Sequence, residues 1–186
     1  IIQVYTSNKG SKRMESDKQK KSRYSRLKSI NAFGYKLNWE DLHSKKVCLP
    51  GVGGLGVLTA EMLTRCGVGE LHIFDKDDIN RENLNRVGFY ERDIGKSKVH
   101  IISKHLHQVN SEVKIFPYYG DIMDLEMDSI FDEAIKKSDL VLMGLDNFPA
   151  RMFVNRKCIN HFTPLIDGGA SRSGLSGYIH VIVPKK

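Results

Sequence analysis

Apolar and polar positions follow one another along the chain in blocks that predict strands and helices in turn. Short, almost wholly apolar runs begin near Val47, Leu71 and Leu140, and such runs are typical of strands buried on both faces. Stretches with apolar residues every three or four positions separate these runs and indicate helices. The pattern therefore predicts an α/β fold, a Rossmann-like, mostly parallel sheet with helices on both faces.

The expected elements can be given by residue range. Strands are expected over 47–50, 71–74, 113–118, 140–145, 165–169 and 177–184, and helices over 55–66, 96–109, 128–137 and 150–162. Two short helical segments, 23–30 and 38–44, precede the first strand. The segment 23–30 has so few apolar groups that we do not expect it to fold back onto its own core.

Charge divides the chain into a basic arm and a neutral body. Of the formal net charge of +7, all is accounted for by residues 1–28, which hold nine Lys or Arg against two Asp or Glu. We expect 1–22 to be a disordered arm and 23–186 to be the folded domain. A body without net charge gives no electrostatic reason to expect nucleic-acid binding. No apolar run approaches the length of a membrane span.

The cysteines indicate the redox state of the cellular compartment. Cys48, Cys66 and Cys158 stand far apart in the sequence without a C-x-x-C pair, which is typical of a reducing compartment. We therefore expect a cytoplasmic protein. A nuclear location stays open because of the basic run at 18–21.

A glycine-rich turn follows the first expected strand. Gly51, Gly53 and Gly56 have the spacing G-x-G-x-x-G, with Gly54 between them; these glycines allow a tight turn, close approach to a phosphate, and packing of helix on strand. The next helix would point its positive N-terminal end at an anion. Asp75 comes directly after the second strand, where a carboxylate can accept hydrogen bonds from ribose. This order predicts a nucleotide site.

Positive side chains gather after Asp75. Arg81, Arg86 and Lys98 lie among several asparagines, and a bound triphosphate needs fixed positive charges besides its metal. A single one of these cations would also be ordinary on a solvated surface. As a group they favour a nucleoside triphosphate over NAD.

A further acidic residue follows the fourth expected strand. Because ligands of an open parallel sheet bind beyond the carboxyl ends of its strands, Asp146 and Asn147 are expected beside the glycine loop. Asp146 can hold Mg²⁺, which prefers one or two carboxylates together with phosphate oxygens and water. The alternative is that these two residues only cap the helix that follows.

Together these motifs resemble the adenylation domain of the ubiquitin-like-protein activating enzymes (E1 enzymes), whose bacterial ThiF and MoeB relatives act in thiamine and molybdopterin biosynthesis. The matching motifs are residues 51–56, 74–77, 83–86, 95–99 and 146–151. Residues 24–27 and 59–67 are most similar to the enzymes of that family that activate the ubiquitin-fold modifier.

The resemblance implies a function and a set of site residues. It implies an enzyme that uses ATP and Mg²⁺ to adenylate the C-terminal glycine of a ubiquitin-like modifier. Nucleotide-binding positions would be Gly51, Gly53, Gly54, Gly56, Asp75, Asp77, Asn83, Lys98, Asp121 and Asn147, with Asp121 standing where the family has Asn. Asp146 would hold Mg²⁺, and Arg86 and Lys98 would act on the reacting phosphates. Arg26 would reach the ATP site of the other subunit of a homodimer.

The resemblance also bears on what this chain lacks. The family continues into a Cys-x-x-Cys zinc site, a catalytic-cysteine segment and a modifier-binding tail, and the complete protein would work with an E2-type conjugating enzyme. We expect zinc only beyond the end of this chain and no thioester-forming cysteine within it. A nucleotide-binding fragment, or a pseudoenzyme subunit that binds ATP and modifier without turnover, is the alternative. NAD-dependent reduction is disfavoured by the cation-rich segment.

Overall fold

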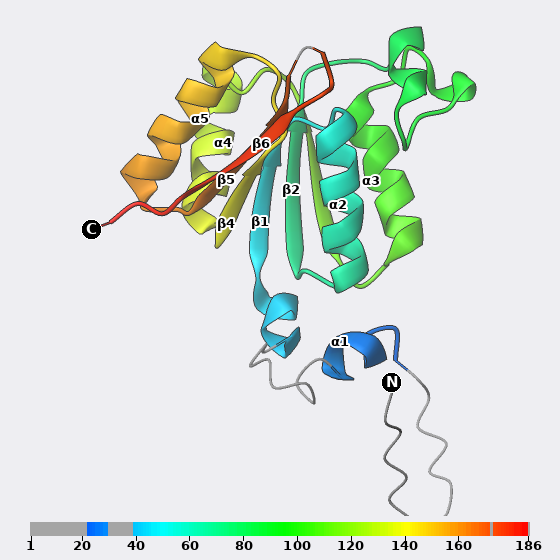
Figure 1. Ribbon diagram of the computed structural model, residues 1–186, viewed down its shortest axis with the longest axis vertical. Coiled ribbons are helices and arrows are strands. Elements are labelled where there is room, and N and C mark those ends of the chain that lie inside the picture. Colours follow the sequence, from blue (N-terminus) through cyan, green and yellow to red (C-terminus); the bar gives the residue numbers. More distant parts are fainter. Residues whose placement is uncertain (1–21, 30–38, 172, 186) are drawn as a thin grey trace, which may run out of the picture.

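The computed structural model describes residues 22–29, 39–171 and 173–185 (Figure 1). Its helices, including the 3₁₀ helices labelled η, and its strands are α1 (Ser25–Ser29), η2 (Trp39–Ser44), β1 (Lys46–Pro50), α2 (Gly54–Cys66), β2 (Glu70–Asp75), η3 (Arg81–Asn85), η4 (Glu91–Asp93), α3 (Lys98–Val109), β3 (Lys114–Tyr119), α4 (Leu125–Lys137), β4 (Leu140–Met143), α5 (Phe148–His161), β5 (Leu165–Ala170) and β6 (Gly177–Ile182). The expected arm lies outside the described residues except for Ser22, and its disorder stays a prediction.

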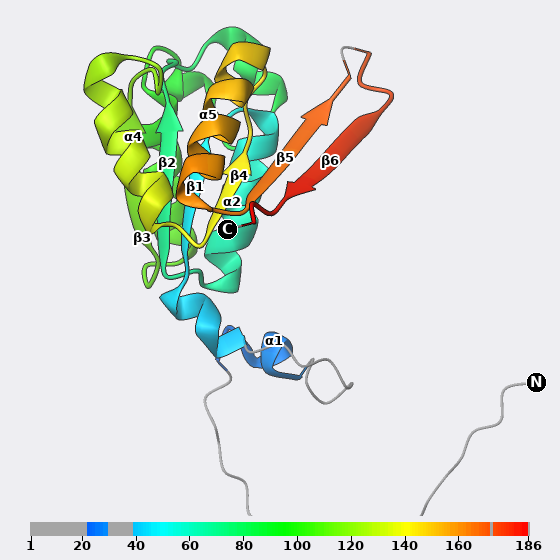
Figure 2. The same ribbon diagram turned by 90° about the vertical axis from the view of Figure 1, so that its left-hand side faces the viewer.

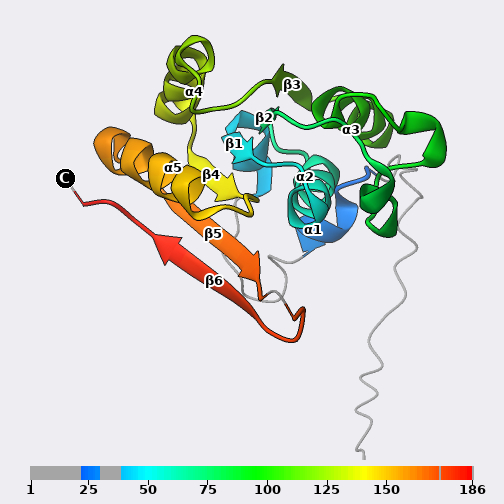
Figure 3. The same cartoon turned by 90° about the horizontal axis from the view of Figure 1, so that it is seen from above.

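The strands form one sheet in the order β3-β2-β1-β4-β5-β6. Every described pair is parallel except β5 with β6, which is antiparallel. Helices α2 and α3 cover one face and α4 and α5 the other, while β5 and β6 extend to one side (Figures 2 and 3). The expected α/β fold with a mostly parallel sheet is confirmed. No helix of the described residues is long and apolar enough to cross a membrane.

The core lies in two layers, one on each face of the sheet. In β1, Val47 and Leu49 belong to the cluster that includes residues of α2 and α3, whereas Cys48 between them belongs to the cluster with α4 and α5. Successive strand residues point to opposite faces, so a strand covered on both faces must be apolar at nearly every position. This is why the continuous apolar runs predicted strands correctly.

Helix α5 begins two residues before its expected start, and the reason is local. Asn147 is its N-cap, with the side-chain oxygen accepting from the Ala150 N–H at 2.9 Å. Pro149 then occupies the first turn, where its missing N–H removes no helical hydrogen bond. The cap therefore lies before the apolar spacing that marked the helix.

The N-terminal segment folds back onto its own body, so our expectation for it was wrong. Tyr24 is only 5% exposed, and its ring stacks on Trp39 and meets His43 edge-on. Its hydroxyl donates to Glu112 Oε2 at 2.9 Å and accepts from Asn110 Nδ2 at 2.8 Å. One aromatic side chain with a polar end is enough to anchor the segment, which the low apolar content did not indicate.

Replacing Tyr24 by alanine is expected to lower the free energy of unfolding by about 3–5 kcal/mol, the usual cost of truncating a buried aromatic residue. Tyr24→Phe keeps the ring and should cost only about 1–3 kcal/mol for its two hydrogen bonds. Urea unfolding followed by circular dichroism measures both. Tyr90, which is 54% exposed, gives the control Tyr90→Ala. Equal stability of the two alanine variants would show that the segment is not docked.

Candidate functional site

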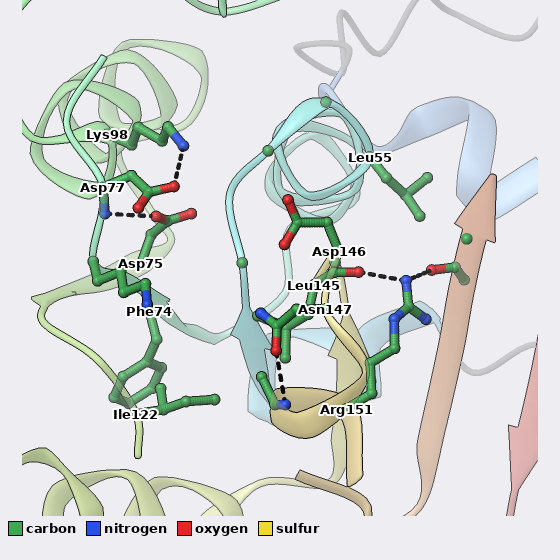
Figure 4. A pocket seen from close by; sticks show the side chains of 18 of the residues that line it. Leu55, Phe74, Asp75, Asp77, Lys98, Ile122, Leu145, Asp146, Asn147 and Arg151 are labelled. Atoms are coloured by element: carbon green, nitrogen blue, oxygen red, sulfur yellow. Dashed lines mark hydrogen bonds and ion pairs between the residues drawn. The ribbon is translucent and has the colours of Figure 1, made fainter. Parts of the chain in front are cut away.

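The carboxyl ends of the central strands meet at a cavity of about 950 Å³. Its wall consists of the glycine loop after β1, the ends of β2 and β3, the loop between β4 and α5, and parts of β5 and β6. Figure 4 shows side chains around this space, among them Asp75 of β2, Lys98 of α3 and Asp146 of the loop between β4 and α5. The sheet thus brings together loops that are far apart in the sequence, as expected for the carboxyl edge of a parallel sheet.

The glycine loop presents backbone rather than side chains to the cavity. Gly53 precedes α2 as its N-cap without a side-chain hydrogen bond, so the first N–H groups of this helix are not satisfied by a cap and can bind an anion. Gly51 has φ of 89°, and a Cβ there would lie 2.7 Å from the Gly144 carbonyl oxygen. Gly56 does not line the cavity. It packs against Gly51, and a Cβ on Gly56 would lie 2.0 Å from the Gly51 carbonyl oxygen.

Asp75 connects the glycine loop to the end of β2. Its Oδ2 accepts from the Val52 N–H at 2.8 Å and its Oδ1 from the Asp77 N–H at 2.9 Å. Burial raises the pKa of the Asp75 carboxyl above its ordinary value, against the opposing effect of these two N–H groups. Each carboxylate oxygen has lone pairs left, so Asp75 can still accept hydrogen bonds from ribose.

Two cations lie beside the glycine loop. Lys98, the first residue of α3, is 8% exposed, and its Nζ contacts Asp77 Oδ2 at 2.7 Å (Figure 4). Arg86 is exposed and lies over the start of α2, where a Cβ on Gly54 would be 3.3 Å from its Cδ. Both line the cavity. The site therefore combines an uncapped helix start with two positive side chains, which is an arrangement for binding phosphates.

Asp146 and Asn147 have different roles. Asn147 lines the cavity and also caps α5, so the capping alternative applies to Asn147 and not to Asp146. Asp146 is exposed, lines the cavity, and makes no hydrogen bond or ion pair with the residues that the structure describes. No group of three possible metal ligands occurs within the described ranges. A single free carboxylate fits Mg²⁺ that takes its other ligands from phosphates and water.

Asp121 lines the cavity and is already occupied by protein partners. Its Oδ2 contacts Lys76 Nζ at 2.8 Å and its Oδ1 accepts from the Met123 N–H at 3.0 Å. The hydrogen bond from Lys76 holds the pKa of the Asp121 carboxyl below its ordinary value. Asp121 therefore stays charged beside the end of β2, joined to a cation that the sequence reasoning did not single out.

Asn83 and Arg26 lie away from the cavity of their own chain. Asn83 does not line the cavity, because its side chain is 9% exposed and accepts from the Asn80 N–H at 2.9 Å to cap η3. Arg26 belongs to α1, which lies at the amino ends of the strands, opposite the edge that holds the cavity (Figure 1). The fold therefore keeps Arg26 away from the cavity of its own chain.

The sequence reasoning missed Arg151 and Tyr178, which also line the cavity. Arg151 falls within a motif that carried the family resemblance, and its place in the first turns of α5 was the available signal. Tyr178 lies on the exposed strand β6, where alternating apolar residues gave no reason to choose it.

The buried cysteines are poor nucleophiles. Cys48 and Cys158 are both fully buried. Burial raises the pKa of both thiols, that of Cys158 to about 12. A reactive thiol needs a lowered pKa and access to solvent, so neither residue is suited to forming a thioester.

Comparison with known proteins assigns the family. The ThiF family profile matches residues 24–186. The protein named ubiquitin-like modifier-activating enzyme 5 of Culex quinquefasciatus is 38% identical over 180 residues, covering 92% of this chain and 45% of its own length. The Gallus gallus protein of the same name is 37% identical over 169 residues, covering 87% and 43%.

The fold has a counterpart among solved structures. The crystal structure of E. coli MccB with MccA-N7isoASN matches with a TM-score of 0.75 at 28% identity, over 89% of this chain and 48% of that one. The chain thus spans about half the length of the relatives it matches. The profile covers the whole sheet and the cavity, and we conclude that the chain belongs to the ThiF family.

Proposed function

We propose that this chain adenylates the C-terminal carboxylate of a ubiquitin-like modifier with ATP and Mg²⁺. The modifier class is supported by the relatives named ubiquitin-like modifier-activating enzyme 5, and the resemblance points to the ubiquitin-fold modifier. The observation that carries the proposal is that Lys98 and Arg86 stand beside the glycine loop in a cavity that also receives Asp75 and Asp146. NAD carries only a pyrophosphate and would need fewer cations beside the glycine loop than a triphosphate.

The residues of the cavity would hold ATP along its length. The N–H groups at the start of α2 would bind phosphate oxygens, with the positive end of the helix dipole behind them. Asp75 would accept hydrogen bonds from the ribose. Asp146 would hold Mg²⁺, which would neutralise part of the phosphate charge. This arrangement would bring the α-phosphate near the glycine loop and within the field of Lys98.

The chemistry needs alignment and positive charge. The modifier carboxylate attacks the α-phosphorus and forms a new O–P bond, while the bond from that phosphorus to the bridging oxygen breaks and pyrophosphate leaves with the electron pair. Two anions must approach each other, so Lys98 and Arg86 would lower the barrier by neutralising the charge that accumulates on the phosphoryl oxygens. A fragment that only binds nucleotide and modifier would use the same cavity without this exchange of bonds.

The nucleotide preference separates this proposal from an NAD enzyme. ATP with Mg²⁺ is expected to bind more tightly than NAD in calorimetric titrations. Asp75→Ala should weaken ATP binding by about 10- to 100-fold, since a hydrogen bond to a charged group contributes about 1.5–3 kcal/mol. Asp41, an exposed residue of η2, gives the control Asp41→Ala. Tighter binding of NAD than of ATP would refute the proposal.

The assembly is also proposed. We propose a homodimer in which Arg26 acts at the partner's cavity, and the support is that α1 is docked at the end of the body away from its own cavity. A two-fold interface would place both copies of Arg26 equivalently. An E2-type partner and a cytoplasmic location are further proposals that rest on the family resemblance and on the cysteine pattern.

A further inference from the structure

Arg151 joins three parts of the cavity wall. From α5, its Nη1 donates to the Asp167 carboxylate on β5 and to the Tyr178 hydroxyl on β6. Its Nη2 donates to the Leu145 carbonyl, and to the Gly168 carbonyl at 3.2 Å (Figure 4). The side chains of Arg151 and Asp167 are only 15% and 13% exposed. A nearly buried guanidinium with four acceptors fixes the backbone and side chains around it.

One of these acceptors belongs to the residue directly before Asp146. The Leu145 carbonyl is held by Arg151, while the preceding Gly144 N–H donates to the Pro50 carbonyl at 2.9 Å. On the other side, Asn147 is fixed as the cap of α5. The backbone around Asp146 is thus held on both sides, while the Asp146 carboxylate makes no hydrogen bond or ion pair with any described residue.

We propose that Arg151 is the positioning residue that holds Asp146 where the carboxylate and the nucleotide phosphates can share one Mg²⁺. This inference rests on the proposed function and adds to it a residue that acts on the metal ligand through the backbone. The positive charge of Arg151 is matched by Asp167, so the guanidinium holds the loop without placing a net charge beside the metal. Residues that orient a metal ligand typically change metal affinity by 10- to 100-fold when replaced.

The geometry of the guanidinium explains why lysine cannot replace it. Arg151 uses both terminal nitrogens: Nη1 donates to side chains on β5 and β6, whereas Nη2 donates to the Leu145 carbonyl and to the Gly168 carbonyl of β5. A lysine keeps the charge but has one nitrogen on a flexible stem. Arg151→Lys should therefore keep the ion pair with Asp167 and lose the hold on the Leu145 carbonyl.

The test measures how strongly Mg²⁺ promotes ATP binding. In calorimetric titrations of this chain with ATP, Arg151→Lys should bind ATP in EDTA within about 2-fold of the original chain. Its apparent Mg²⁺ affinity in the presence of ATP should fall by about 10- to 100-fold. Arg156→Lys, an exposed change on the same helix, is the matched control and should leave both values unchanged.

A double-mutant cycle shows whether Arg151 acts through Asp146. Asp146→Ala should remove most of the Mg²⁺ effect, and adding Arg151→Lys to it should change the Mg²⁺ affinity no further. Additive losses, or an unchanged Mg²⁺ affinity in Arg151→Lys alone, would overturn the inference. Equal weakening of ATP binding with and without Mg²⁺ would also overturn it, because that is the effect of a scaffold residue.

Two further outcomes keep the inference separate from the proposed function. If the original chain binds no ATP, or if Mg²⁺ has no effect on its ATP binding, the proposed function fails whatever the variants do.

Thermal unfolding shows whether Arg151→Lys is folded. Tyr178→Phe on exposed β6 removes one partner of the guanidinium with less risk to the fold, and it should lower the Mg²⁺ affinity in the same direction. If Arg151→Lys does not fold, Tyr178→Phe decides: a folded Tyr178→Phe variant with unchanged Mg²⁺ affinity counts against the inference.

Discussion

Replacing Lys98 by alanine is expected to slow ATP–pyrophosphate exchange by at least ~100-fold, the usual loss when one fixed donor to a reacting oxygen is removed. Lys98 is nearly buried, pairs with Asp77, and lies beside the glycine loop. Its charge is thus placed before ATP arrives, so the loss should appear mainly in turnover. Arg86→Ala is expected to act in the same direction, because Arg86 lies over the start of α2.

The measurement is exchange of labelled pyrophosphate into ATP in the presence of a ubiquitin-like modifier, together with ATP affinity from calorimetry. Lys104→Ala is the control, because Lys104 is an exposed residue of the same helix without a hydrogen bond or ion pair among the described residues. Exchange that stays unchanged while ATP affinity falls would assign Lys98 and Arg86 to ground-state binding. No exchange by the original chain, with ATP bound, would favour the nucleotide-binding fragment.

Mixing two inactive variants is expected to restore activity if Arg26 completes the partner's site. Arg26→Ala and Asp146→Ala should each lose at least ~100-fold in exchange. In the mixed dimer, one cavity keeps its own Asp146 and receives Arg26 from the other chain. The second cavity lacks both groups. Equal mixing gives half mixed dimers with one intact site each, so about a quarter of the original activity should return.

The docking of α1 makes this result informative. Tyr24 holds α1 at the amino ends of the strands, away from the cavity of the same chain. Recovery would show that Arg26 acts across a subunit interface. Without recovery, and with subunit exchange demonstrated by mass spectrometry, Arg26 would act in its own site or not at all. A mixture of Arg26→Ala with unchanged chain controls for dilution.

Local sequence patterns were sufficient for the fold class and for most of the site. The apolar runs, the glycine spacing and the acid that ends β2 each depend on residues that are close in sequence. The rule that ligands bind beyond the carboxyl ends of parallel strands then placed the glycine loop, Asp75 and Asp146 together, and all three line one cavity. Resemblance added residues that patterns alone did not mark, and one of these, Asn83, does not line the cavity.

The sequence alone could not show that Asn83 lies away from the cavity. Whether Asn83 faces a cavity or caps η3 depends on its contact with Asn80, and two polar roles of one side chain look alike in a sequence. Asp146 and Asn147 presented the same ambiguity, which the contact from Ala150 resolved in favour of Asn147 as the cap.

The sequence by itself thus determined the alternation of elements and the chemistry available at the sheet edge, because periodicity and turn residues act over a few positions. Only the tertiary structure decided which polar groups meet. Tyr24 contacts Glu112 across 88 positions, and Arg151 contacts Tyr178 across 27. Such contacts depend on the packed positions of separate elements, and a hydrogen bond requires its two atoms within about 3 Å. No pattern of residue types specifies that distance before the chain has folded.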